Sequence, residues 1–129
     1  MIKLTFCLHR LEGLSPEEFR RYWFENHAPL VRKNAPALGM RRYVQLHSHD
    51  LDSPFNQGLR ASRGASPGFD GVAEIWWDSE EQMAAAVATP EGRAASAELL
   101  EDERRFIDLE RSSLWAGDEK EIISEGELS

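Results

Sequence analysis

Residues 14–31 read LSPEEFRRYWFENHAPLV, and this stretch contains the start of an amphipathic helix. Ser15 is a favourable N-cap residue, Pro16 suits the first helical position, and the acidic residues 17–18 lie at the positive end of the helix dipole. Apolar side chains then recur at helical spacing. The stretch therefore predicts a helix with one buried face, formed by Phe19, Trp23 and Leu30, with Tyr22 and Val31 beside them.

An irregularity is expected in this helix next to His27. Pro29 has no N–H group, and its ring crowds the carbonyl of Glu25, so the helix should kink or break there. With about 100° per residue, His27 lies about 80° from Phe19, at the edge of the buried face. The helix is expected to end near Asn34, with residues 34–39 as a loop.

Strands flank this helix. Residues 2–10 alternate in type, which predicts a strand with Ile2, Leu4, Phe6 and Leu8 on a core face and Lys3, Thr5, Cys7 and His9 on the other. Residues 40–49 and 70–78 predict two more strands, and residues 111–123 contain a fourth. Ser79 is the expected N-cap of a second helical region, which is interrupted at residues 89–92 and continues over residues 93–108.

The resulting order predicts an α+β fold, the ferredoxin-like split β-α-β arrangement. We expect one domain over residues 1–129, with a four-stranded antiparallel sheet and the helices on one face. Residues 50–69 are rich in Pro, Gly and Ser and are expected to form a long loop. The uncovered sheet face must be buried, and a second copy of the chain would give a two-sheet homodimer with an internal cavity.

Composition narrows the classes of partner. The net charge of −8 over 129 residues disfavours nucleic acid and anionic membranes as partners. No apolar run is long enough for a membrane span, and the one cysteine excludes an intrachain disulfide and a cysteine-based zinc site. These features suit a cytoplasmic protein. Residues 118–129 hold five acids and one lysine and are expected to form an acidic C-terminal strand or tail.

His27 is the first candidate for chemistry. Its unperturbed pKa of about 6.5 suits proton transfer at neutral pH, and a helix break would present it to a cavity as a general acid or base. The alternative is that His27 hydrogen-bonds to a nearby carbonyl and only stabilises the kink.

A second group of candidates is expected on the sheet face away from the helices. It contains polar groups and aromatic rings, as small-molecule cavities do, and a dimer interface is the alternative. The group comprises His9, Tyr43, Gln45, His47, His49, Glu74 and Trp76. Within it, His47 and Glu74 would form a catalytic acid/base pair if their strands are neighbours, and the other members would bind substrate. His47 and His49 also have the spacing of two metal ligands, with His9 or Glu74 as a third. Cys7 is expected to reach the cavity, with a small buried thiol as the simpler interpretation.

Four segments together resemble the EthD family of ferredoxin-like dimeric α/β barrels. They are LSPEEFRRYWFENHAPLV (14–31), RRYVQ (41–45), GVAEIWWDS (71–79) and RFID (105–108). The resemblance implies an enzyme without cofactor or metal, acting on a hydrophobic or aromatic small molecule in association with monooxygenase catabolism. The resemblance also supports a catalytic role for His27 more strongly than the spacing of the residues does by itself.

Three functions remain open at the level of sequence. The first is an enzyme that carries out cofactor-free oxidation, as an oxidoreductase would, or dehydration or isomerisation. The second is a non-catalytic carrier auxiliary to an oxygenase system. The third is a purely structural dimer.

Overall fold

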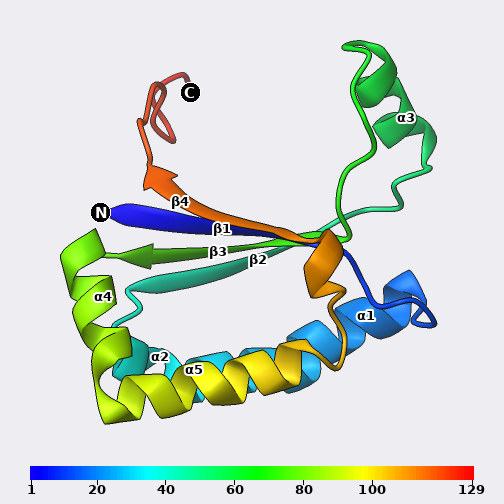
Figure 1. Cartoon of the computed structure of the whole chain (residues 1–129). Helices are drawn as coiled ribbons and strands as arrows, with labels where there is room; N and C mark the ends of the chain where they lie inside the picture. The colour runs from blue at the N-terminus through cyan, green and yellow to red at the C-terminus, as the bar shows by residue number, and fades with distance from the viewer.

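The computed structural model describes residues 1–129 and contains one antiparallel sheet with helices against one of its faces (Figure 1). The strands are β1 (Ile2–Leu8), β2 (Arg42–His47), β3 (Gly71–Trp77) and β4 (Ser113–Asp118), in the order β2-β3-β1-β4. The helices are α1 (Pro16–Tyr22), the π-helix η1 (Trp23–His27), α2 (Ala28–Leu38), α3 (Pro54–Ala61), α4 (Glu80–Ala88), α5 (Pro90–Glu103) and the 3-10 helix η2 (Leu109–Arg111). The predicted ferredoxin-like α+β fold is confirmed.

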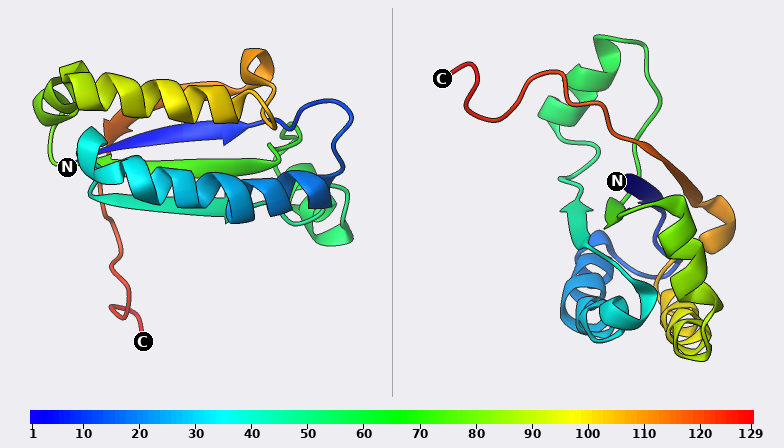
Figure 2. Two further views of the ribbon diagram at one scale, coloured as in Figure 1. Left: turned by 90° about the horizontal axis from the view of Figure 1, so that it is seen from below. Right: turned by 90° about the vertical axis from the view of Figure 1, so that its left-hand side faces the viewer.

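The core lies between the sheet and a layer of helices, which consists of the consecutive helices α1, η1 and α2 on one side and α5 on the other. Figure 2 shows α1 and α2 following one another beside α5, all beneath the strands. The apolar face predicted for β1 is confirmed, because Phe6 and Leu8 pack on the buried rings of Phe19, Trp23 and Phe106. A second cluster joins α2 to α5, and it consists of Val31, Leu38, Ala95 and Leu99.

The irregularity predicted beside His27 is present, but it is a widening of the helix ahead of Pro29 and not a break. Trp23–His27 form a π-turn in which the Ala28 N–H group donates to the carbonyl oxygen of Trp23. Pro29 then falls in the first turn of α2, where its missing N–H group costs little. The π-turn therefore accommodates the proline and keeps His27 within a continuous helix.

The loop predicted over residues 34–39 is also wrong, because α2 continues to Leu38 with Pro36 inside it. Leu38 is buried against α5, and this packing outweighs the local preference of the Pro-containing segment to end the helix. Gly39, at a φ of 73°, supplies the left-handed residue that ends α2.

The faces of β2 are reversed from the predicted ones. Arg42 pairs with Trp76 and Val44 with Glu74, so these residues share the sheet face away from the helices. Tyr43, Gln45 and His47 therefore face the helix layer instead. Apolar Val44 and Leu46 lie on the face that is open in this chain, so the alternation of β2 did not reveal which side faces the core.

The segment over residues 50–69 is not only a loop, because it contains α3. Ser53 caps this helix by accepting from the N–H group of Asn56. Figures 1 and 2 show α3 projecting beyond the open face of the sheet. The last strand is shorter than predicted and ends at Asp118, and the acidic residues that follow form no helix or strand. None of the helices combines the length and the apolar composition that crossing a membrane requires.

Gly71→Ala is expected to destabilise the fold. A Cβ atom at this position would lie 2.4 Å from a ring carbon of Trp23, whose side chain is fully buried in the core. Overpacking of this kind costs about 1–3 kcal/mol. Gly58→Ala is the matched control, since no atom lies within 4 Å of a Cβ there. Helix propensity should make that control more stable, by about 0.5–1 kcal/mol. Urea unfolding would measure both, and a Gly71→Ala protein as stable as wild type would contradict this account of the Gly71–Trp23 contact.

Candidate active site

His27 lies at the centre of a buried polar cluster between the helices. Its Nδ1 atom is 2.7 Å from a carboxylate oxygen of Asp102 in α5, and only 4% of His27 is exposed. The other oxygen of Asp102 accepts from the Tyr22 hydroxyl at 2.6 Å and from Arg105 at 3.1 Å. The ring of Phe106 packs against the imidazole. The position and orientation of His27 are therefore fixed by three elements, α1, η1 and α5.

The electrostatics of the cluster favour a neutral His27. Burial lowers the pKa of His27, against the opposing effect of Asp102. Burial also acts to raise the pKa of Asp102, but hydrogen bonds from Tyr22, His27 and Arg105 outweigh it and lower that pKa. Asp102 is thus a carboxylate that accepts the Nδ1–H proton of His27. The remaining ring nitrogen, Nε2, is then unprotonated and able to act as a base.

His27 borders a small apolar cavity between the helix layer and the sheet. The cavity measures about 40 Å³, and ten of its twelve lining residues are hydrophobic. His27 and Glu103 are the polar exceptions. No fully buried side-chain nitrogen or oxygen lacks a hydrogen-bond partner, and Nε2 of His27 has none. Nε2 therefore retains some accessible surface, and His27 is one of the residues that line the cavity.

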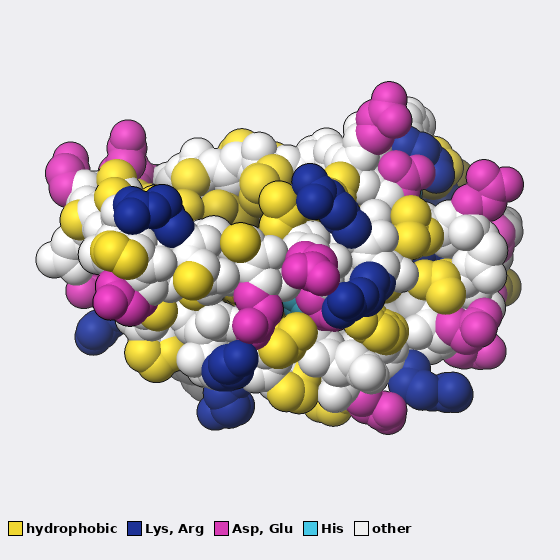
Figure 3. Space-filling view, turned by 60° about the horizontal axis from the view of Figure 1, so that its bottom comes forward, with side chains coloured by type: hydrophobic (Ala, Val, Ile, Leu, Met, Phe, Trp, Pro, Cys, Tyr) yellow, Lys and Arg dark blue, Asp and Glu magenta, His cyan; other side chains and the backbone are white.

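A larger apolar groove adjoins this cavity on the outside of α2. Its volume is about 630 Å³, and Phe24, Ala28 and Pro29 contribute to its wall. Val31, Met40 and Tyr43 line both the groove and the cavity. Because β2 is an edge strand, the groove opens beside the sheet rather than through it. Elsewhere the helical face carries acidic and basic side chains scattered among apolar ones (Figure 3).

Three polar side chains of β2 form a ladder that ends at Tyr43. The Gln45 amide nitrogen donates to the Trp23 carbonyl at 3.2 Å and to the Tyr43 hydroxyl at 3.0 Å. The Gln45 carbonyl oxygen is 2.7 Å from Nε2 of His47, whose ring stacks on Trp23. Burial raises the pKa of Tyr43 and lowers that of His47. The structure thus places Tyr43, Gln45 and His47 beside the π-turn that carries His27.

Glu74, Trp76 and Cys7 lie on the open sheet face, as predicted, and so on the opposite side of the sheet from His27. Glu74 pairs with Lys3, and the Trp76 indole donates to Glu119 while Arg42 lies over its ring. Cys7 is buried, and burial raises the pKa of its thiol. The sheet separates Glu74 from His47, so the acid/base pair predicted for these two residues does not form.

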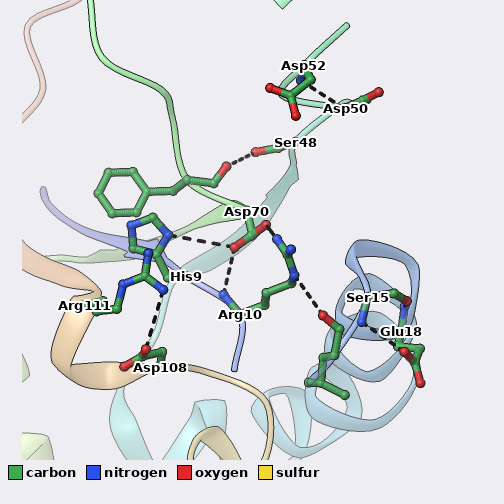
Figure 4. A network of polar contacts seen from close by, with 12 residues as sticks. His9, Arg10, Ser15, Glu18, Ser48, Asp50, Asp52, Asp70, Asp108 and Arg111 are labelled. Carbon is green, nitrogen blue, oxygen red and sulfur yellow. Dashed lines mark hydrogen bonds and ion pairs between the residues drawn. The ribbon is translucent and has the colours of Figure 1, made fainter. Parts of the chain in front are cut away.

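His9 and His49 are not brought to the cavity. Figure 4 shows His9 in a polar network at one end of the sheet, against Phe69 and 3.9 Å from Asp70, which also binds Arg10. His49 is exposed beyond the end of β2. No three side chains of His, Cys, Asp or Glu are grouped so that they could ligate a metal ion.

Sequence reasoning missed Asp102 and Glu103. Both follow Ala95 and Leu99, which mark the buried face of α5, and Asp102 continues that face at helical spacing. An acidic residue on an apolar stripe was therefore a usable signal. Its partner was not identifiable, because the contact between Asp102 and His27 spans 75 positions in the sequence.

Glu103→Gln is expected to stabilise the protein increasingly as the pH rises. Burial, aided by the nearby charge of Asp102, raises the pKa of Glu103 to about 7. Between about pH 4.5 and 7 the folded state then binds one more proton than the unfolded state, so wild-type stability falls as the pH rises. Glutamine removes this penalty, with a gain approaching roughly 3 kcal/mol at pH 8 and little at pH 4.5. Urea unfolding across this range measures it, with the exposed Glu101→Gln as control. A gain independent of pH would contradict the prediction.

Comparison with known proteins matches the chain to a family model, to two fungal proteins and to a solved structure. The family model described as EthD domain matches residues 11–110. A decarboxylase from Claviceps purpurea (strain 20.1) is 27% identical over 126 residues, covering 95% of this chain and 86% of that protein. Decarboxylase AgnL1 from Paecilomyces divaricatus is 23% identical over 126 residues, covering 97% and 83%. The crystal structure of an EthD family protein from Bacillus halodurans C-125 superposes with a TM-score of 0.61 at 27% identity, covering 93% of this chain and 99% of that one.

Proposed function

Because the chain belongs to the EthD family, we propose that it is a small-molecule enzyme in which His27 transfers a proton to or from a hydrophobic or aromatic substrate. One observation carries the proposal. Asp102 holds Nδ1 of His27 and leaves Nε2 without a protein partner, and His27 lines an apolar cavity. A base oriented by a carboxylate and shielded from bulk water is the arrangement that general acid–base catalysis requires.

Decarboxylation of an aromatic acid is the reaction that we favour. The names of the two fungal relatives support decarboxylation but name no substrate, whereas the sequence alone left oxidation, dehydration and isomerisation open. The substrate would bind as the carboxylate, and Nε2 of His27 would take up a proton from solvent and donate it to the ring carbon from which CO₂ leaves. The C–C bond breaks, its electron pair stays on that carbon and forms the new C–H bond, and one solvent proton is consumed per turnover.

The substrate would bind with its ring in the groove along α2 and its reacting carbon in the cavity. The apolar wall of the groove suits an aromatic ring, and Val31, Met40 and Tyr43 connect the two spaces. The groove also supports the alternative of a non-catalytic carrier, because it provides a binding surface with no need for His27.

We also propose that the chain acts as a homodimer through its open sheet face. Large apolar side chains are exposed on that side, including Leu46 and Trp115 at 55% each and Phe55 of α3 at 71%. Burial of this surface against a second copy would remove it from water.

Light scattering after size exclusion should give twice the mass of the chain, and a Trp115→Glu variant should shift the protein toward monomer. A wild-type monomer at micromolar concentration would contradict the dimer.

A substrate panel tests the enzymatic proposal. Hydroxylated benzoic and naphthoic acids would be incubated with the protein in D₂O, and CO₂ and the deuterated arene would be measured. We expect at least one acid to yield CO₂ with one deuterium at the vacated carbon. If acids of the panel bind but none is converted, the carrier alternative replaces the enzyme.

A further inference from the structure

We infer that the Tyr43 hydroxyl donates a hydrogen bond to the ligand of this site. Gln45, itself oriented by Trp23 and His47, donates to the Tyr43 oxygen and so leaves the hydroxyl hydrogen free for the ligand. The inference rests on the proposed function only in taking the cavity and groove as the ligand site. It adds a positioning system on β2 and a requirement on the ligand, which must present an oxygen acceptor to Tyr43.

The orientation of the Gln45 amide is fixed by the backbone. The carbonyl oxygen of Trp23 can only accept, so the Gln45 atom 3.2 Å from it must be the NH₂ group. This carbonyl is the first of the π-turn and also accepts from the Ala28 N–H group. The Gln45 oxygen therefore points to His47, which must carry its proton on Nε2 to complete the 2.7 Å contact.

The amide orientation sets the polarity of Tyr43. The same NH₂ group donates to the Tyr43 hydroxyl oxygen at 3.0 Å, so that oxygen is an acceptor in this contact. No acceptor in the protein receives the hydroxyl hydrogen of Tyr43. An aromatic hydroxyl in a largely buried position usually finds a partner for its hydrogen. The unused donor is on a residue that lines both the cavity and the groove, which is where a ligand would supply the acceptor.

The ligand class follows from this geometry. A carbonyl, phenolic or carboxylate oxygen on the aromatic ring of the ligand would accept from Tyr43. His27 would then contact the acidic group of the same ligand. A purely hydrocarbon ligand would leave the Tyr43 donor unpaired and would bind less well, because a buried unpaired donor is costly.

Bound acetophenone provides a direct test, since its carbonyl stretch moves to lower frequency when it accepts a hydrogen bond. The infrared band of ¹³C-carbonyl acetophenone would be recorded with wild type, Tyr43→Phe and Gln45→Glu. The glutamate accepts where glutamine donates, so it should capture the Tyr43 hydrogen and leave the ligand carbonyl free. Both variants should lose the shift and bind acetophenone about fivefold more weakly.

Gln82→Glu on the exposed side of α4 is the matched control for the added charge and should keep the shift. An unshifted wild-type band, or a shift retained in Tyr43→Phe, overturns the inference. A shift retained in Gln45→Glu overturns the role of the ladder, and Tyr43→Phe keeps the test decisive if Gln45→Glu does not fold. The measurement needs no turnover, so a failure to decarboxylate any acid would count against the proposed function and not against this donor.

Discussion

His27→Gln is expected to lower the turnover of any substrate found by about 10²–10⁴-fold, the usual contribution of a positioned acid or base. Glutamine retains a polar group of similar reach, and Asp102 can still accept from its amide. It has no titratable nitrogen, so proton transfer through this position stops. We expect the dissociation constant of the substrate to change by much less than the rate, because the groove supplies most of the binding surface.

His49→Gln is the matched control, since His49 is exposed outside the cavity. It should leave the rate within about twofold of wild type, in line with the small effects of surface substitutions. Equal rates for wild type and His27→Gln would remove His27 from the mechanism. Equal losses in both variants would point to a general effect of histidine replacement and not to this site.

Asp102→Asn is expected to destabilise the protein by about 2–4 kcal/mol and to change the tautomer of His27. The carboxylate accepts from Tyr22, His27 and Arg105, and hydrogen bonds to a charged group contribute about 1.5–3 kcal/mol each. Asparagine keeps the shape but turns one oxygen into a donor, so Nδ1 of His27 must give up its proton to keep that contact, and the negative charge that strengthens the other two contacts is lost. Urea unfolding measures the stability, and the ¹⁵N chemical shifts of the imidazole report the tautomer.

Tyr22→Phe separates the two effects. It removes one donor to Asp102 and leaves the carboxylate beside Nδ1 of His27. We expect a smaller loss of about 1–2 kcal/mol with the tautomer unchanged. An Asp102→Asn protein as stable as wild type, or one with an unchanged His27 tautomer, would contradict the role of Asp102 as the group that orients this ring.

The features that were predictable from sequence are local ones. The Ser15 and Ser79 caps depend on residues three positions apart, and the alternation of β1 is complete because only one of its faces is apolar. From these signals the order of elements followed, and with it the fold. The suggestion that His27 lies at the edge of a buried face also depended only on helical angles.

The features that were not predictable depend on contacts distant in sequence. Leu38 extends α2 through Pro36 because α5 is there to receive it. On β2, Tyr43 packs against both core clusters and Gln45 donates to the Trp23 carbonyl, and both contacts require the side of the strand that faces the helices. Both faces of β2 carry polar and apolar residues, so its period of two indicated a strand without indicating which face is inside.

The location of the ligand tests the central claim most directly, because the sheet separates His27 and Tyr43 from the open face that the sequence favoured. A crystal structure of the protein with acetophenone bound would determine it. We predict electron density for the ring in the groove along α2, with the carbonyl oxygen within hydrogen-bonding distance of the Tyr43 hydroxyl and His27 beside it. Density for the ligand on the open sheet face, against Glu74 and Trp76, with none beside His27, would contradict the account.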